Sequence, residues 1–232
     1  MCNLYRTRSG RSELVAASRA MHADVGNLEP GDIYPDYLAP IVRNGAEGRE
    51  VVRARWGMPS SKKMLLDVAS KRADKLRAKG KDVDADAFAE LLKLEPDNGT
   101  TNVRNTASRH WTRWLEPANR CLAPFNAFSE PGYTDGKYKP VWFALSEDQP
   151  LTFFAGIETR DWSGVRKMKT GWETCDVFAF LTTEPNAEVG AVHPKAMPVI
   201  LHPSDFDRWL SADHPGACAL AAPFPSQLMQ VS

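Results

Sequence analysis

The chain has 232 residues, of which 43% are hydrophobic and 25% are charged, so it can build a packed core and lacks the composition of a disordered protein. Its 29 basic residues balance its 29 acidic ones, which removes the simplest argument for binding to nucleic acid. A local basic groove stays open, because phosphates respond to the local potential rather than to the net charge.

The sequence gives little support for a membrane protein or for a protein stabilised by disulfides. No apolar run reaches the roughly 18–20 residues that span a bilayer, and Met1–Arg6 has no apolar stretch typical of a signal peptide. We therefore expect a cytoplasmic protein with no membrane partner. Cys2, Cys121, Cys175 and Cys218 lie far apart and form no CxxC pair, which favours free thiols over disulfides and gives no support to a structural zinc site.

The first quarter of the chain mixes helix, irregular structure and strand. Residues 11–21 alternate polar and apolar groups at helical spacing after Ser12, which we expect to be the N-cap. Three prolines between Glu29 and Pro40 predict an ordered irregular segment. The segment Glu50–Trp56 is typical of a strand, because β-branched and aromatic residues alternate there with arginines.

Residues 61–98 have a different character, that of a basic helical insertion. A first helix with an apolar stripe should end at Gly80, a second should run from Asp84 to Leu94, and the turn residues at 96–99 then break the chain. This segment is either a solvated helical hairpin inserted between core strands or a basic flap that contacts phosphates. Its basic residues within twenty positions are Lys62, Lys63, Lys71, Arg72, Lys75, Arg77, Lys79 and Lys81, and its apolar stripe is Met64, Leu65, Leu66, Val68 and Leu76.

The second half is rich in strand patterns, with a short helix from Pro203 to Leu210. Short turns join most of the strands, and regular crossover helices are missing, so the pattern indicates an α+β fold in one domain, residues 1–232. The predicted strands are Val141–Leu145, Leu151–Ile157, Cys175–Thr182 and Ala196–Leu201.

Cys2 is the most informative single residue. A small side chain at position two permits removal of Met1, which leaves an amino-terminal cysteine. Such a terminus carries an α-amine with a pKa near ~8 beside a thiol with a pKa near ~8.5, so both nucleophiles are partly available at neutral pH. An amine condenses with an aldehyde to an imine, and the neighbouring thiol can then close a five-membered thiazolidine ring.

Three further clusters carry groups suited to catalysis or anion binding. Asn102 and Arg104 are two apart and face the same side of an extended chain, which suits an anionic oxygen ligand, whereas an Asn-rich turn with a surface arginine is the favoured explanation when this cluster is taken alone. Glu130 closes an aromatic stretch where burial would raise its pKa, or it is a surface glutamate at a strand end. His193 precedes a buried-type strand as an acid–base group or a structural residue, whereas His202 fits a surface or capping position.

Taken together, these clusters resemble the SRAP family, the SOS-response-associated peptidases or abasic-site-processing proteins. The resemblance spans nearly the whole chain, in the family's order. The segments that carry it are Met1-Cys2-Asn3, Arg55-Trp56-Gly57-Met58-Pro59, Asn102-Val103-Arg104, Arg120-Cys121-Leu122 through Glu130, and His193 with the strand that follows.

The resemblance implies a protein that senses abasic sites in single-stranded DNA and forms a covalent DNA–protein crosslink. Cys2 would be the nucleophile, its amine forming the Schiff base and its thiol closing the thiazolidine. Glu130 would move protons, His193 would stabilise the sugar oxygen, Asn102 would hold Cys2, and Arg104 would hold a phosphate. The peptidase activity assigned to the family is understood as self-removal of the initiator methionine.

The resemblance also implies a mainly antiparallel, barrel-like sheet with flanking helices, no cofactor, a monomer and a nucleoid-associated location. Arg6 and Trp56 would be further DNA contacts. The sequence departs from the family pattern where Asn3-Leu4 follow Cys2, where Ser129-Glu130-Pro131 lack the usual tyrosine and tryptophan, and where Ser60-Ser61 replace tryptophans that wedge against bases.

Two other functions fit the same residues. Cys2 could serve as the amino-terminal nucleophile of an amidohydrolase with His193 as its base. Alternatively, aromatic residues could stack on bases in a protein that binds single strands without reacting with them.

Overall fold

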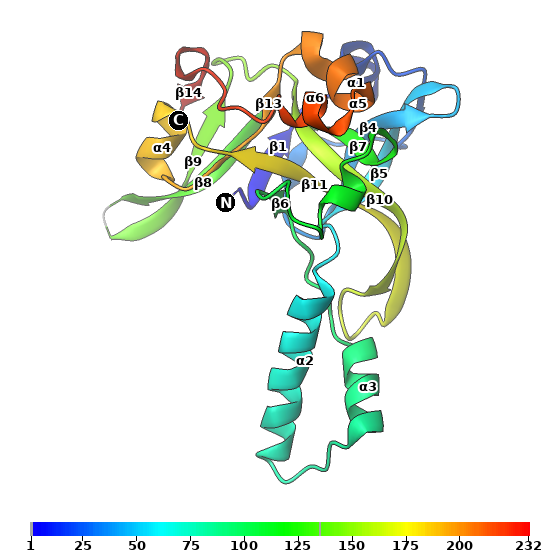
Figure 1. The fold of residues 1–232 in the computed structure, drawn as a ribbon. Coiled ribbons are helices and arrows are strands. Elements are labelled where there is room, and N and C mark those ends of the chain that lie inside the picture. Colours follow the sequence, from blue (N-terminus) through cyan, green and yellow to red (C-terminus); the bar gives the residue numbers. More distant parts are fainter. Residues whose placement is uncertain (1, 135) are drawn as a thin grey trace.

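The computed structural model describes residues 2–134 and 136–232, which form an α+β domain built on a small β-barrel (Figure 1). Five strands follow one another around the barrel in the order β11, β10, β7, β4, β5, and a parallel pairing between β5 and β11 closes the ring, so the expected barrel-like sheet is confirmed. The strands are β4 (Leu38–Gly45), β5 (Gly48–Trp56), β7 (Arg120–Phe125), β10 (Thr152–Val165) and β11 (Trp172–Thr183).

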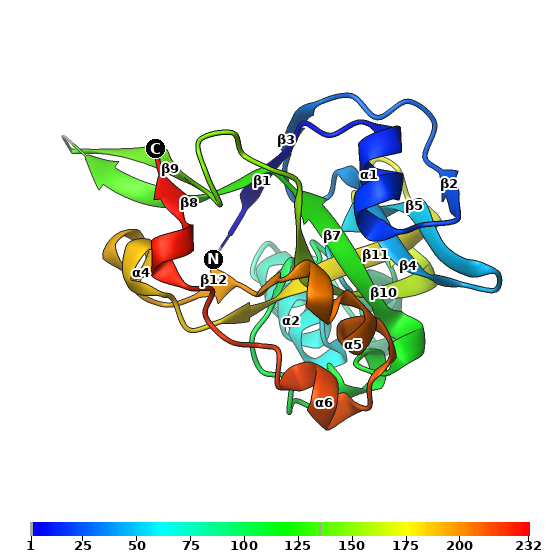
Figure 2. The same cartoon turned by 90° about the horizontal axis from the view of Figure 1, so that it is seen from above.

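A second antiparallel sheet packs beside the barrel, as Figure 2 shows from above. Strand β1 of this sheet carries the amino terminus between β3 and β8, so residues near the start of the chain lie among buried elements. In sheet order its strands are β14 (Gln230–Val231), β9 (Lys137–Ala144), β8 (Ala127–Thr134), β1 (Leu4–Thr7) and β3 (Gly31–Ile33).

Short strands and helices complete the domain. None of the helices in the described part of the chain combines the length and the hydrophobicity needed to cross a membrane. The short strands are β2 (His22–Asp24), β6 (Asn102–Val103), β12 (Met197–Pro198) and β13 (Ile200–Leu201), and the helices on the body are α1 (Arg11–Ser18), α4 (Ala187–Val192), α5 (Phe206–Ser211) and α6 (His214–Cys218).

The side chains of each barrel strand divide between two cores. Along β11, Phe178 and Phe180 belong to an aromatic core that also takes in Tyr5 of β1, while the alternate residue Ala179 belongs to a second core formed with α1 and α5. Trp56 stacks on Phe180 at 5.1 Å in the aromatic core. This alternation is the period of two that the strand pattern predicts.

Several sequence predictions need correction at element ends. Helix α1 begins at Arg11 after the N-cap Gly10, so Ser12 is a residue of the first turn and not the cap. The segment Glu29–Pro40 is not wholly irregular, since it contains β3 and the start of β4. The strand predicted over Ala196–Leu201 is split at Val199 into β12 and β13, which pair with different strands.

The predicted insertion is a helical hairpin of α2 (Lys62–Arg77) and α3 (Ala85–Lys93) that projects from the body (Figure 1). Both helices begin at local caps: Ser61 Oγ accepts from the amide of Met64 at 3.2 Å, and Asp84 Oδ1 accepts from the amide of Ala87 at 2.8 Å. The predicted helical insertion is therefore confirmed, and these caps, which the sequence prediction did not use, fix where its helices begin.

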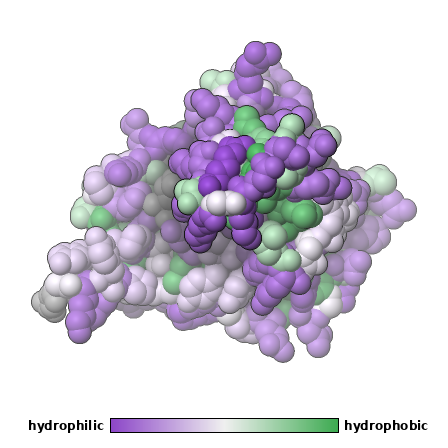
Figure 3. Space-filling view, turned by 90° about the horizontal axis from the view of Figure 1, so that it is seen from below, coloured by the Kyte–Doolittle hydropathy of each residue, from purple (hydrophilic) through white to green (hydrophobic). Residues whose placement is uncertain are grey.

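The expected apolar stripe of α2 is only partly an inner face. The helix buries the small residues Ala69 and Ala73, whereas Met64, Leu66 and Val68 stay 43–46% exposed. Figure 3 looks along the hairpin from below and shows hydrophilic residues over most of it, with patches of hydrophobic surface alongside. Its lysines are exposed, so the hairpin presents positive charge to solvent.

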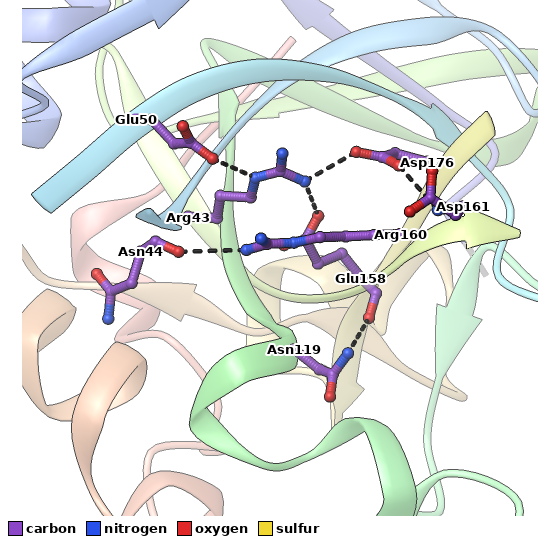
Figure 4. A network of polar contacts seen from close by, with 8 residues as sticks. All are labelled: Arg43, Asn44, Glu50, Asn119, Glu158, Arg160, Asp161 and Asp176. Carbon is purple, nitrogen blue, oxygen red and sulfur yellow. Dashed lines mark hydrogen bonds and ion pairs between the residues drawn. The ribbon is translucent and has the colours of Figure 1, made fainter. Parts of the chain in front are cut away.

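A buried ion-pair network crosses the barrel around Arg43 of β4 (Figure 4). Its Nε donates to Glu50 at 2.7 Å, and its Nη1 donates to Glu158 at 2.9 Å and to Asp176 at 2.8 Å. Glu158 and Asp176 belong to β10 and β11, which are not neighbours of β4 in the ring, so the guanidinium spans the barrel interior. Burial raises the pKa of the Glu158 carboxyl, whose side chain is fully buried.

This network predicts a large cost for removing its cation. Arg43→Ala should lower the free energy of unfolding by about 3–5 kcal/mol, because it leaves the buried Glu158 carboxylate without its main partner. Arg160→Ala is the matched control, since Arg160 pairs with the same carboxylate at 3.4 Å but is 44% exposed, and it should cost under about 1 kcal/mol. Urea denaturation of both variants checks this, and equal costs would contradict it.

Candidate functional site

Cys2 lies at the start of β1 and is completely buried. Its Sγ donates to the carbonyl of Leu4 at 3.4 Å, which folds the side chain back over its own strand. Burial raises the pKa of the Cys2 thiol well above its ordinary value, and the nearby charge of Glu130 raises it further. The thiol is therefore held protonated. Met1 lies outside the described residues.

Asn102 holds the main chain of Cys2. Its Nδ2 donates to the Cys2 carbonyl at 2.9 Å and also to Thr101 Oγ1 at 2.7 Å. The residue is 7% exposed, and its Oδ1 is buried with no hydrogen-bond partner among the described residues. An unfilled acceptor beside a potential nucleophile can take a hydrogen bond from a ligand or from a rearranged amino terminus.

The segment that carries Asn102 is fixed by a close crossing of two chain segments. Gly57 and Gly99 both have positive φ, and a Cβ on Gly99 would lie 2.9 Å from the Gly57 Cα, so only glycine fits there. The buried Arg166 ties the crossing together by donating to the carbonyls of Gly57 and Asp97. Asp97 also accepts from the amide of Gly99 at 2.9 Å.

Glu130, which lies near enough to Cys2 to influence its pKa, is close to His193. Glu130 is fully buried on β8, and His193 caps the C-terminal end of α4. Glu130 Oε2 lies 3.9 Å from His193 Nδ1, which donates to the carbonyl of Ala196 at 3.1 Å. Burial raises the pKa of the Glu130 carboxyl, while the charge of His193 opposes that rise. The site therefore pairs a carboxyl that keeps its proton above the ordinary range with an imidazole beside it.

A cavity of about 710 Å³ opens directly next to these groups. We call it the tyrosine cavity, because Tyr34, from the segment between β3 and β4, and Tyr138 of β9 both line it. The residues that line it include the immediate neighbours of the site, namely Asn3, Leu4, Thr101 and Ser129, together with Pro35, Asn98, Gly99, Pro131, Lys139 and Pro140.

Arg104 lies at a different recess, of about 470 Å³, which shares no lining residue with the tyrosine cavity. Its guanidinium donates to the carbonyls of Thr183 at 2.6 Å and Lys195 at 3.0 Å, and its side chain is 43% exposed. Through Lys195 it braces the segment that follows His193. A phosphate contact by Arg104 stays a prediction.

Arg6 is engaged within the fold. Its Nε and Nη2 contact the two oxygens of Asp32 at 2.5 and 3.1 Å, and its guanidinium lies 4.2 Å from the centre of the Trp142 ring. The structure therefore gives this cation a carboxylate and an aromatic face, so the expected contact with DNA would have to compete with both.

Trp56 has no exposed surface in this structure. Its indole Nε1 donates to the carbonyl of Thr101 at 3.1 Å, and its ring packs between Tyr5 and Phe180. In this structure the Trp56 ring has no exposed atoms with which to make the expected direct contact with DNA. What Trp56 contributes is the position of Thr101, and through it that of Asn102.

The sequence thus supplied Cys2, Asn102, Glu130 and His193, and the structure brings these four residues together. A model of the SRAP family, SOS response associated peptidase, matches residues 1–232.

The chain belongs to the SRAP family.

Solved structures show the same fold at low sequence identity. One protein of Bordetella bronchiseptica is 22% identical with a TM-score of 0.66, covering 100% of this chain and 98% of that one. One of Bacteroides thetaiotaomicron is 19% identical with a TM-score of 0.67, covering 99% and 90%. A phage-related protein of Bordetella bronchiseptica is 16% identical with a TM-score of 0.61, covering 100% and 93%. No curated protein matches this SRAP chain.

Sequence reasoning missed the exposed tyrosines at the cavity. Tyr34 stands in the segment expected to be irregular, and Tyr138 stands just before a predicted strand. The one signal that the sequence offers is an aromatic residue next to a proline or lysine, which is common at many surfaces.

Among the described residues of this SRAP protein, no group of three His, Cys, Asp or Glu side chains is placed to hold a metal ion.

The raised pKa of Glu130 predicts a pH-dependent stability. A carboxyl whose folded pKa is raised contributes stability that is fully present below its ordinary value of 4.5 and is lost as pH rises through the folded pKa. Glu130→Gln has no carboxyl to ionise, so it lacks this loss. The free energy of unfolding of the variant should therefore increase relative to that of the wild type as pH rises above 4.5, by up to about 1.4 kcal/mol for each pH unit between 4.5 and the folded pKa. Urea titrations across this range check it, and parallel pH profiles would contradict it.

Proposed function

We propose that this SRAP protein captures abasic sites in single-stranded DNA through an amino-terminal Cys2. The observation that carries the proposal is the position of Cys2: Asn102 holds its carbonyl, the Glu130 carboxyl lies close enough to influence its pKa, and the adjacent residues Asn3 and Leu4 line the tyrosine cavity. Hydrolysis of the Met1–Cys2 peptide bond would consume one water and free the α-amine. The family description as a peptidase supports this self-processing step.

The proposed reaction is a condensation followed by a ring closure, with no redox step. The α-amine of Cys2 adds to the C1 aldehyde of the ring-opened sugar, and the resulting carbinolamine loses water to give an imine. The thiol then adds across the C=N bond, forming a C–S bond while its proton passes to nitrogen, and the product is a thiazolidine. Removing the imine withdraws the group that promotes β-elimination, so the strand is shielded.

The environment of Cys2 supports this order of events. Because the thiol pKa is raised, the amine is the better nucleophile for the first step, and the thiol reacts only once an imine stands beside it. The raised pKa of the Glu130 carboxyl suits the donation of a proton to the leaving water, and His193, 3.9 Å away, lies close enough to restore that proton to Glu130. Asn102 Oδ1 offers an acceptor for the amine or for a sugar hydroxyl.

Substitution of Cys2 tests the covalent step. Incubation with an oligonucleotide that carries one abasic site should add the mass of the strand, less one water, to the wild-type protein, in an adduct that survives heating without borohydride. Cys2→Ser should give an adduct that needs borohydride trapping, since it retains the amine but not the thiol. Cys2→Ala should give no heat-stable adduct. Intact-mass spectrometry reads all three proteins.

The outcomes of that experiment separate the candidate activities. A heat-stable adduct of undiminished yield in Cys2→Ala would exclude the proposal. Loss of Met1 without any adduct would favour an amidohydrolase that uses the same terminus. The mass of each free protein reports whether Met1 has been removed, and only processed protein enters the comparison.

The basic hairpin supplies a second prediction, on phosphate contacts. Lys71 and Lys75 are exposed and four residues apart on α2, so they present charge on one face. Lys71→Glu/Lys75→Glu should weaken binding to single strands and flatten its salt dependence by about 0.7 in log–log slope for each phosphate that the variant no longer neutralises. Fluorescence anisotropy at several salt concentrations measures the slope.

Arg11→Glu/Arg208→Glu is the control for net charge. Both arginines are exposed on α1 and α5, at the opposite end of the molecule from the hairpin (Figure 1). This double variant should leave the slope unchanged. If the two double variants behave alike, the hairpin is a solvated face and does not contact phosphates.

A further inference from the structure

Two pairs of exposed tyrosines border the tyrosine cavity. Tyr34 and Tyr37 are 44% and 53% exposed with ring centres 5.5 Å apart, and Tyr133 and Tyr138 are 67% and 77% exposed with ring centres 5.1 Å apart. One member of each pair, Tyr34 and Tyr138, lines the cavity itself. Large aromatic side chains that are exposed to solvent beside a cavity are typical of a ligand-binding surface.

The first pair stands on a braced loop between β3 and β4. The amide of Tyr37 donates to the carbonyl of Tyr34 at 3.1 Å, which closes a turn. Asp36 within this turn pairs with Lys167 at 2.8 Å and with Arg55 at 3.2 Å. The two rings are therefore presented by a backbone that is already ordered, so a ligand that stacks on them loses little conformational entropy.

The second pair stands on the hairpin of β8 and β9, which extends away from the barrel (Figure 2). Tyr133 lies opposite Tyr138 in the ladder, and Pro131 lies opposite Pro140 two positions nearer the body. All four side chains thus share one face of the hairpin, and Pro131, Tyr138 and Pro140 line the cavity. The neighbouring Lys139 also lines it and brings a positive charge.

The chemistry of this surface fits nucleobases with a backbone phosphate between them. Rings on either side of a cavity can stack on the faces of two bases, and stacking accepts any base because every base has a π-face. An abasic nucleotide has no base to stack, so a site that binds one must make its stacking contacts with the neighbouring nucleotides. Two exposed tyrosines that line one cavity are suited to this role.

We propose that Tyr34 and Tyr138 stack on the bases that flank the captured nucleotide, with Lys139 pairing with a phosphate. The identity of the central nucleotide rests on the proposed function, whereas the stacking does not. Undamaged single strands therefore bind the same surface.

The test is the affinity for an undamaged single-stranded oligonucleotide, read by fluorescence anisotropy. Tyr34→Ala and Tyr138→Ala should each weaken binding about tenfold, which is the range of one base–aromatic stack, and the double variant should weaken it about a hundredfold. Tyr34→Phe and Tyr138→Phe should bind like the wild type, because the ring and not the hydroxyl makes the contact. All these side chains are exposed, so the variants should fold normally.

Met21→Ala is the control. Met21 is 68% exposed, lies between α1 and β2, does not line the tyrosine cavity, and should leave affinity unchanged. Equal affinity of the two alanine variants and the wild type overturns the proposal, as does a wild type that binds no single strands. A weakening in the phenylalanine variants equal to that in the alanine variants also overturns it.

Covalent capture is measured separately, so that the two proposals can fail independently. At oligonucleotide concentrations that saturate each variant, Tyr34→Ala and Tyr138→Ala should crosslink abasic DNA at the wild-type rate, while Cys2→Ala should bind undamaged strands normally. Weakened affinity in the tyrosine variants together with a wild type that forms no adduct keeps the stacking surface and removes the covalent function. Crosslinking with unchanged affinity in those variants keeps the covalent function and removes the stacking surface.

Discussion

The closing of the barrel along β11 is the constraint on which the site depends. β11 pairs with β5 at Val177 and Phe178, and further along its same edge it pairs with β6 at Phe180 and Leu181, both in parallel. The helical hairpin leaves the chain between these two pairings. The insertion, residues 61–98, therefore begins and ends at one place on the barrel edge.

This arrangement explains why so many buried polar groups gather where the insertion departs. Met58 and Thr100 pair as a bridge, Gly57 and Gly99 cross at a distance only glycines allow, and Arg166 fastens the crossing. The result is a fixed position for Asn102, which is far along the chain from the cysteine that it holds.

The second sheet supplies the other half of the site. β1 lies between β3 and β8, so Cys2 reaches the interior, and β8 places Glu130 beside it. Burial raises the pKa of both groups, which makes the thiol a weak nucleophile and favours the Glu130 carboxyl as an acid. In the proposed function, reactivity then depends on the amine that removal of Met1 would release.

The sequence by itself determined the local features. The apolar stripe before Gly80 and the turn residues at 96–99 predicted the hairpin, because helical spacing and chain breaks are local patterns. Runs of β-branched and aromatic residues predicted three of the five barrel strands, β5, β10 and β11, for the same local reason, whereas β4 and β7 were not predicted. Cys2, Asn102, Glu130 and His193 could be predicted as site residues because the chemistry of each side chain and the order of their motifs are both properties of the sequence.

Only the tertiary structure decided what each side chain faces. Arg6 and Trp56 looked available for DNA, yet Asp32 pairs with the first and Phe180 covers the second, and both partners come from distant strands. Tyr34 and Tyr138 gave no signal, since they meet at one cavity only after the long stretch of chain between them has folded. Exposure and partnership are set by long-range pairing, which no local pattern encodes.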